Sequence, residues 1–367
     1  MLLLSEDQKL LMASARAAVA EKAPIGKFRE LRADPNGLGF SPEFWRTSAE
    51  LGWTGVLVPE AFGGLDFGVV GAGLIAREMA RDLAPSPFLS TSVLAASALA
   101  RAGSPAQMAD WLSRIARGEA IVAFAVDEGP HPSALAARAS RQASGWRLDG
   151  EKRFVLDGHA ADAILIAAEA EGEAALFLAG ADAPGLSRAV RTLIDGRRVA
   201  SVRLDGVSVD AGARLAGGAA TIEAVLDVGR AVVSAALCGV AEEAFARTAR
   251  YLKERRQFDR RIGSFQALQH RAARMHIEIE NAWSASLKAM QSIEARANSA
   301  ALDVAIAKAK ASDVACAATA ECLQMHGGIG MTDEFDIGLF PKRARVDSVL
   351  FGDAAFHADR VATMLGY

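Results

Sequence analysis

Apolar residues recur at helical spacing over the first part of the chain, and polar or turn-forming residues separate the segments. Leu10 to Val19 shows this period, and Ser41-Pro42 is typical of a helix start, with serine as N-cap and proline in the first turn. Further helical segments are Val69 to Leu83, Thr91 to Ala102 and Pro105 to Ile115. The pattern predicts an N-terminal α-helical domain over residues 1–119.

The pattern changes near Ala120. Ile121 to Val126 is a compact apolar run, and shorter alternating segments follow it. Turn-forming pairs punctuate these segments at Ser144-Gly145, Asp149-Gly150, Glu171-Gly172 and Asp205-Gly206. Because such pairs are typical of hairpin turns, we expect a middle antiparallel, β-barrel-like domain over residues 120–215.

From Thr221 onward the period is helical again, and the segments are long. One apolar stripe is formed by Leu268, Ala272, Met275, Ile279 and Trp283, and a second by Ala301, Val304, Ala305, Ala311, Val314, Ala315 and Ala318. These stripes predict a C-terminal α-helical bundle over residues 216–367. The fold class expected for the whole chain is therefore α+β.

Composition and charge exclude several classes of protein. The chain is 51% hydrophobic and 23% charged, which favours a globular fold, and its net charge of −3 provides no basic field for nucleic acid or an anionic membrane. The three cysteines lack CxxC spacing, so we expect buried thiols and no metal. Met1-Leu2-Leu3-Leu4 lacks the features of a signal peptide, and no apolar run reaches the ~20 residues of a membrane span. We expect a cytoplasmic protein with small-molecule or protein partners.

Four motifs resemble those of one enzyme family. They are Val58-Pro59-Glu60-Ala61-Phe62-Gly63-Gly64, Phe124-Ala125-Val126-Asp127-Glu128, Glu254-Arg255-Arg256-Gln257-Phe258 with Ile262 to Gln266, and Gln324-Met325-His326-Gly327-Gly328-Ile329-Gly330. Together with the α, β, α order, they make the chain similar to the acyl-CoA dehydrogenase superfamily across essentially its whole length. The resemblance implies that FAD is the cofactor and acyl-CoA the substrate.

The resemblance places FAD-binding roles on the Arg255 segment. Arg255 has the fork of donors that suits the pyrophosphate, and Gln257 and Phe258 suit contact with adenosine. In the family this segment reaches into the site of a neighbouring subunit. Phe154 stands where the family has a tryptophan beside the flavin ring.

The glycine motif near the C-terminus has a second set of FAD-binding roles. Gly327 and Gly328 permit close backbone approach to the dinucleotide, and Gln324 suits hydrogen bonding near the adenine end. His326 lies inside this motif, but a lone histidine beside two glycines is expected to be a packed or surface residue.

The family's catalytic base is missing from both of its usual positions. The reaction is α,β-desaturation of an acyl thioester, in which a carboxylate, usually glutamate, removes the α-proton. Phe351 stands at one glutamate position and Gly229 at the other. Asp353, two residues beyond Phe351, is the candidate for a displaced base. Arg230 has two open roles, either beside the flavin or acyl carbonyl or in a salt bridge of the bundle.

Further departures concern the flavin ring. Gly129-Pro130-His131-Pro132-Ser133 replaces the family's Gly-x-Gly-Ser-Asp stretch, and Phe154-Val155-Leu156 replaces Trp-x-Thr. Asp127 and Asp353 replace neutral threonines. Because the flavin becomes anionic on reduction, extra carboxylates near it would disfavour reduction.

Several functions remain open at this point. The leading hypothesis is a subunit that completes a flavin site beside a homologous chain carrying the glutamate, similar to the small subunits of two-component bacterial acyl-CoA dehydrogenases of the pimeloyl-CoA or steroid side-chain type. Such an enzyme is a homo- or hetero-tetramer that passes electrons to an acceptor such as an electron-transfer flavoprotein. The alternatives are an active homo-oligomer using Asp353, a flavin oxidase or monooxygenase, and a structural partner without flavin.

Overall fold

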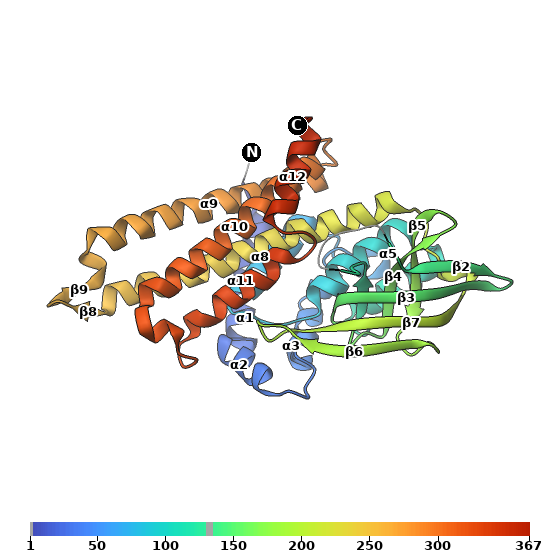
Figure 1. Cartoon of the computed structure of the whole chain (residues 1–367), viewed down its shortest axis with the longest axis horizontal. Coiled ribbons are helices and arrows are strands. Elements are labelled where there is room, and N and C mark those ends of the chain that lie inside the picture. Colours follow the sequence, from blue (N-terminus) through green and yellow to red (C-terminus); the bar gives the residue numbers. More distant parts are fainter. Residues whose placement is uncertain (1–2, 130–134) are drawn as a thin grey trace. The chain divides into compact units, whose positions relative to one another are not determined.

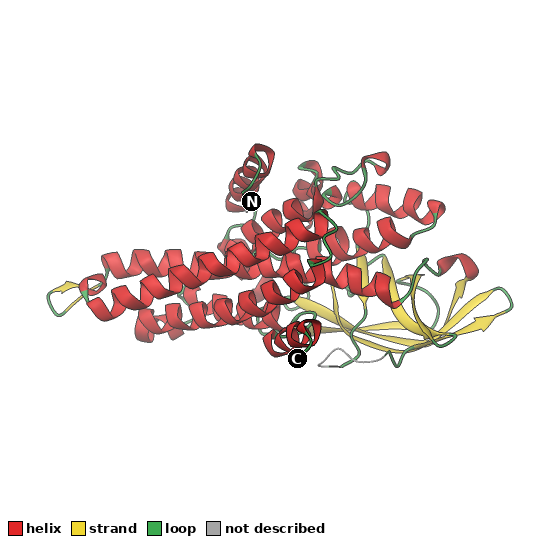
Figure 2. Cartoon of the chain, turned by 90° about the horizontal axis from the view of Figure 1, so that it is seen from above, coloured by secondary structure: helices red, strands yellow, loops and turns green. Residues whose placement is uncertain are grey.

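The computed structural model describes residues 3–129 and 135–367, and its contacts group the chain into two compact units. The first unit comprises Met1–Glu30, Val69–Ala84 and Arg230–Tyr367, and the second comprises Leu31–Gly68 and Pro85–Gly229. The expected order of helices, then strands, then long helices is confirmed (Figures 1 and 2). The prediction that the first four residues are not part of a signal peptide concerns Met1 and Leu2, which lie outside the described residues.

Short helices make up the region before the sheet. They are α1 (Glu6–Lys22), α2 (Ile25–Ala33), α3 (Pro42–Glu50), η1 (Trp53–Gly55), η2 (Glu60–Phe62), α4 (Gly68–Arg81), η3 (Phe88–Ala95), α5 (Ala96–Ala102), α6 (Pro105–Gln107), η4 (Met108–Leu112) and α7 (Ser113–Ala116). The predicted N-cap of α3 is present, because Ser41 Oγ accepts the Phe44 N–H at 3.2 Å.

The middle of the chain forms one mixed sheet. Its strands are β1 (Val122–Ala125), β2 (Arg138–Gln142), β3 (Gly145–Leu156), β4 (Ala163–Ala170), β5 (Glu173–Gly180), β6 (Leu186–Thr192) and β7 (Arg198–Asp210). The strand order is β1-β4-β2-β3-β7-β6, and β5 pairs with β4. The pairings β1–β4 and β2–β4 are parallel and the others are antiparallel, so the sheet is mostly but not wholly antiparallel.

Two of the four predicted hairpin turns are wrong. Ser144 lies in the turn between β2 and β3, and Glu171-Gly172 joins β4 to β5, as expected. Asp149-Gly150 and Asp205-Gly206 instead lie inside β3 and β7, where the pairing register shifts. Gly150 and Gly206 have φ of +140° and +69°. Glycine serves β-bulges as well as turns, so the same dipeptide is compatible with either.

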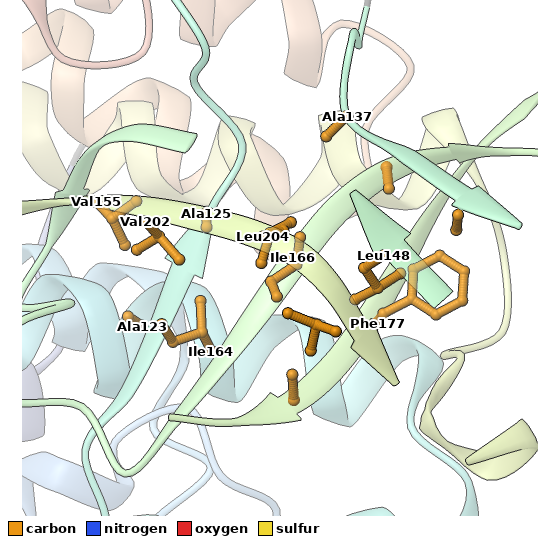
Figure 3. Close-up of a cluster of buried hydrophobic side chains, with 14 of the residues drawn as sticks. Ala123, Ala125, Ala137, Leu148, Val155, Ile164, Ile166, Phe177, Val202 and Leu204 are labelled. Carbon is orange, nitrogen blue, oxygen red and sulfur yellow. The ribbon is translucent and has the colours of Figure 1, made fainter. Parts of the chain in front are cut away.

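The sheet encloses a core of aliphatic and aromatic side chains (Figure 3). Leu148, Ile164 and Leu204 point into this cluster and are at most 3% exposed. The rings of Trp146 and Phe177 lie 5.3 Å apart at 60°, a tilted aromatic contact. This packing fixes the strand that carries Phe154.

Long helices dominate the C-terminal part. After η5 (Ala211–Ala213), the elements are α8 (Ala219–Glu254), β8 (Arg256–Gln257), β9 (Arg260–Arg261), η6 (Ile262–Ser264), α9 (Gln266–Glu294), α10 (Ala300–His326), η7 (Gly327–Met331), η8 (Asp336–Gly338), α11 (Leu339–Val349) and α12 (Ala354–Leu365). Helices α8, α9 and α10 run side by side, and the short β8–β9 hairpin stands at the end of α8 and α9 (Figures 1 and 2). Met275 and Ile279, from the predicted stripe, are buried.

Helix α4 packs closely on α8 within the first unit. A Cβ built on Gly239 would lie 2.1 Å from the Arg77 carbonyl oxygen, so this approach requires glycine. Arg77 donates to Glu242 at 2.7 Å and its guanidinium lies 4.1 Å from the Trp283 ring centroid, which ties α4 to α8 and α9. Among the described residues α8 is the one helix long and apolar enough to cross a membrane, but 83% of that window is buried, as in a core helix of a globular protein.

Candidate functional site

The β8–β9 hairpin presents an aromatic side chain at an exposed tip. Phe258 and Asp259 form its two-residue loop, with φ of +53° and +57°. Two positive φ values are typical of a type I′ turn, in which phenylalanine is unfavourable. Phe258 is nevertheless 84% exposed, and the Phe265 ring meets it edge-on at 6.1 Å. A strained and exposed aromatic residue indicates a binding role.

Two polar side chains predicted to bind the dinucleotide lie beside this tip. Arg255 follows the last residue of α8, is exposed, and makes no ion pair or hydrogen bond through its side chain with the described part of the chain. Gln257 is exposed too, and its Nε2 donates to the Arg256 carbonyl at 3.0 Å. The Arg255 donor fork is therefore available to an anionic ligand.

The glycine motif ends α10 and leaves open backbone. Gly327 has φ of +66°, which favours glycine, and nothing lies within 4 Å of a Cβ built on Gly327 or Gly328. Gln324 is exposed, and no described residue accepts or donates a hydrogen bond to its amide. An exposed amide beside bare backbone fits the edge of a nucleotide.

Phe154 belongs to the second unit, whereas the Arg255 and Gln324 segments belong to the first. It lies on β3 where the pairing register with β7 shifts, between Lys152 and Val155. Its φ is +52° and it is 47% exposed. Its ring is thus accessible for a contact with flavin.

In the turn at Phe351, the backbone carbonyl of Phe351 is bound by a guanidinium and an imidazole. Arg230 Nε donates to the Phe351 carbonyl at 3.0 Å, and His357 Nε2 lies 3.1 Å from the same oxygen. Arg230 is 1% exposed and His357 is fully buried. Phe351 has φ of +58°, unusual for a side chain of this size. Arg230 therefore positions the turn that carries Phe351.

Lys308 completes this clamp and was not among the residues predicted for the site. Its Nζ donates to the carbonyls of Ser348 at 2.8 Å and Gly352 at 3.0 Å, and to Ser312 Oγ at 3.1 Å. Burial lowers the pKa of Lys308 to about 7, and burial together with the Arg230 charge lowers that of His357 to about 3. The available signal was the spacing of Lys308, which lies three residues after Ala305 and three before Ala311 and so falls on the apolar stripe of α10, unlike Lys310.

Asp353 is engaged as a helix cap. Its Oδ1 accepts the Phe356 N–H at 2.9 Å, which makes it the N-cap of α12. The same residue accepts the His357 N–H through its carbonyl at 3.1 Å. Its carboxylate thus caps the start of α12 and is held there by a backbone N–H. A base that removes a substrate proton would instead need its carboxylate free to reach the substrate.

The segment after β1, which was predicted to lie beside the flavin ring, is held by a partly buried ion pair. Lys152, fully buried on β3, pairs with Glu128, which also accepts the Ala136 and Ala137 N–H groups at 2.6 and 3.0 Å. Burial opposes ionisation of Glu128, but the bond from Lys152 keeps the net pKa shift downward. Of the stretch Gly129-Pro130-His131-Pro132-Ser133, all but Gly129 lies outside the described residues.

Comparisons with known proteins decide the family. Residues 5–119 match the family "Acyl-CoA dehydrogenase, N-terminal domain" and residues 216–366 match "Acyl-CoA dehydrogenase, C-terminal domain". Acyl-CoA dehydrogenase FadE27 of Mycobacterium tuberculosis is 31% identical over 338 residues, 89% of this chain and 88% of FadE27. The chain belongs to the acyl-CoA dehydrogenase family. Its class is that of flavoprotein oxidoreductases, and its cofactor is FAD.

Other relatives agree with this assignment. Acyl-CoA dehydrogenase IpdE2 of Mycolicibacterium smegmatis is 30% identical over 350 residues, 95% of this chain and 96% of IpdE2. The crystal structure of the ChsE4-ChsE5 complex of Mycobacterium tuberculosis aligns with a TM-score of 0.92 at 28% identity, covering 100% of this chain and 98% of that one. A Tcur3481-Tcur3483 steroid ACAD variant aligns with a TM-score of 0.91 at 31% identity, covering 98% of each chain.

Proposed function

We propose that this acyl-CoA dehydrogenase chain is a subunit that helps form a flavin site but depends on a homologous partner chain for the catalytic glutamate. The reaction of the assembled enzyme is α,β-desaturation of an acyl-CoA thioester. The single observation that carries the proposal is the absence of a carboxylate at both base positions, which hold Phe351 and Gly229.

The surroundings of Phe351 support this proposal. A base must be free to accept a proton within reach of the substrate. Asp353, the displaced candidate, is held by the N-terminus of α12. The side chains of Arg230, Lys308 and His357 hold the backbone carbonyls of Phe351 and Gly352. A backbone shift that brought the Asp353 carboxylate to the place of Phe351 would break several of these buried hydrogen bonds.

The residues predicted to bind FAD fit the adenylate half of the cofactor. Arg255 suits the pyrophosphate, Gln324 the adenine end, and Gly327 and Gly328 leave space where side chains would otherwise stand. FAD, when bound, supplies the acceptor for the substrate hydride. Within the described part of the chain, the Arg255 guanidinium has no ion-pair partner and most of the Phe258 ring is exposed. Both residues therefore suit a site that another subunit completes.

Relatives suggest the substrate class and the assembly. One similar structure is the ChsE4-ChsE5 complex and another is a steroid ACAD, so we propose a steroid-derived or other bulky acyl-CoA as substrate. We further propose a heteromeric tetramer in the cytoplasm, with an electron-transfer flavoprotein as electron acceptor. An active homo-oligomer has no comparable support, because it requires Asp353 to leave its cap.

An anaerobic reduction experiment tests the proposal. The purified chain, alone and reconstituted with its native homologous partner, is mixed with acyl-CoA thioesters under anaerobic conditions and the flavin absorbance is followed. We expect bleaching only with the partner present, and none when the partner's base glutamate is replaced by glutamine. Bleaching of the chain alone would contradict the proposal, and rapid reoxidation by air would favour an oxidase.

A further inference from the structure

A cavity of about 380 Å³ lies in the first unit, and none of its lining residues is among those assigned to FAD. Its lining residues come from the end of α8 and from the segment that follows the glycine motif: Arg247, Arg250, Tyr251, Glu254, His326, Glu334, Phe335, Asp336 and Ile337. Nothing in the proposed dehydrogenase function uses this cavity.

The inner wall contains a buried hydrogen-bond acceptor without a donor. His326 is 4% exposed, and its Nδ1 lies 2.7 Å from the Cys322 carbonyl, so Nδ1 carries the proton. Nε2 therefore carries a lone pair and is an acceptor, and no described residue donates a hydrogen bond to it. Burial lowers the pKa of His326, which keeps the ring neutral. An unpaired buried acceptor is costly, and a ligand N–H would relieve that cost.

Two carboxylates at the mouth also lack cationic partners. Glu254 and Glu334 are exposed and form no ion pair with any described residue. Arg247 is already bound by Glu243 at 3.1 Å and Asp336 at 2.9 Å.

Arg250 is a cation at the same mouth, with 67% of its side chain exposed and 3.8 Å from Glu243. The mouth therefore carries two uncommitted carboxylates against one partly paired cation, which disfavours a phosphate ligand. The unpaired acceptors of the wall are His326 Nε2 and these two carboxylates, and the exposed Arg250 guanidinium is a donor at its rim.

Aromatic rings supply the remaining surface. The Tyr251 ring stacks on His326 with centroids 4.4 Å apart, and Phe335 lies 6.1 Å from Tyr251 and 5.3 Å from His326. Aromatic faces attract cations, and a planar guanidinium stacks on them while donating in its own plane.

We propose that this cavity binds a guanidinium group. The group donates one N–H to His326 Nε2, pairs with Glu254 and Glu334, and packs on Tyr251 and Phe335. The cavity has room for a full arginine side chain, so the group belongs either to a small molecule or to an arginine of an associated protein chain.

Calorimetric titration of the full-length chain with N-acetyl-arginine amide tests the proposal. We expect saturable binding with one site per chain, and no binding of the uncharged isostere N-acetyl-citrulline amide. Glu254→Gln and Glu334→Gln should each weaken binding about two- to fivefold. Glu280→Gln, a change on the exposed side of α9, is the matched control and should leave binding unchanged. The ¹⁵N resonance of His326 Nε2 should move on binding as it accepts the N–H.

Absence of saturable binding, equal binding of the citrulline probe, or equal affinity in all three glutamine variants would overturn the proposal. The source of the natural group is then found with the assembly from its native host. Displacement of a second chain by the arginine probe assigns the group to a protein arginine, whereas a guanidinium compound released on acid extraction, with assembly unaffected by the probe, assigns it to a small molecule.

Discussion

At the scale of single residues, the buried titratable groups around Phe351 contribute to the pH dependence of the protein's stability. His357 and Lys308 are both fully buried and both bind backbone carbonyl oxygens of the same turn. Their pKa values of about 3 and about 7 lie below those of the unfolded chain. Each therefore binds fewer protons in the folded state than in the unfolded state over a defined pH range, and stability rises with pH there.

His357 makes the folded state sensitive to acid. Between the unfolded pKa of about 6.5 and the folded pKa of about 3, protonation favours unfolding by up to about 1.4 kcal/mol per pH unit. His357→Gln keeps a donor for the Phe351 carbonyl but does not titrate. We expect its free energy of unfolding, measured by urea denaturation from pH 7 to 4, to fall less than that of the wild type. His270→Gln, on the exposed face of α9, should follow the wild type; equal slopes for all three proteins would exclude this role of His357.

Lys308 has the corresponding effect at alkaline pH. Between about pH 7 and 10.5 the unfolded chain holds a proton on this lysine that the folded chain releases. The stability of the wild type relative to Lys308→Met should therefore increase with pH across this range, by at most about 1.4 kcal/mol per unit. Urea denaturation of both proteins at pH 7, 8.5 and 10 measures the difference. A difference that stays constant with pH would show that Lys308 remains charged in the fold.

At the scale of elements, substitutions at the start of α12 distinguish two roles of Asp353, helix cap and catalytic base. If the side chain is only a cap, Asp353→Asn retains the bond to the Phe356 N–H, whereas Asp353→Ala loses it and costs about 1 kcal/mol of unfolding free energy. We expect the reconstituted enzyme with Asp353→Asn to keep its turnover. Loss of turnover in Asp353→Asn without loss of stability would identify Asp353 as the base after all.

We propose that the β8–β9 hairpin tip binds FAD at some cost in stability. Phe258 has a positive φ that glycine adopts without strain, so Phe258→Gly should leave stability unchanged or raise it by up to about 1 kcal/mol. The same change removes the exposed ring and should lower the flavin content of the assembled enzyme. Thermal unfolding and flavin absorbance per protein check the two effects. A stable variant with full flavin content would mean that the ring has no role in binding FAD.

The elements were largely predictable from the sequence because their signals are local. Ser41 capped the helix expected there, and the apolar spacing through Met275 marked α9. Hairpin turns were wrongly predicted at Gly150 and Gly206 because β-bulges and turns both use glycine for its positive φ. Lys308 was missed because its three acceptors come together only when α10, α11 and the turn after it pack, and no local pattern specifies that.

At the scale of the whole molecule, flavin binding should depend on surfaces that this chain exposes to another subunit. Arg255→Ala should therefore reduce the flavin content of the assembled enzyme by severalfold without changing the thermal stability of the isolated chain. The adjacent Arg256→Ala, outside the matching positions of the motif, is the control. Equal flavin loss in both variants would mean that any positive charge at this hairpin supports flavin binding, and that Arg255 has no specific role.

The central claim is that this chain shares a dehydrogenase site whose base comes from a homologous chain. Its most direct test is purification of the assembly from the native source, with subunit and flavin stoichiometry determined together. We expect equal amounts of this chain and of a homologous chain that carries glutamate at the position matching Phe351, with bound FAD. A homo-oligomer of this chain alone, with FAD that acyl-CoA reduces, would contradict it.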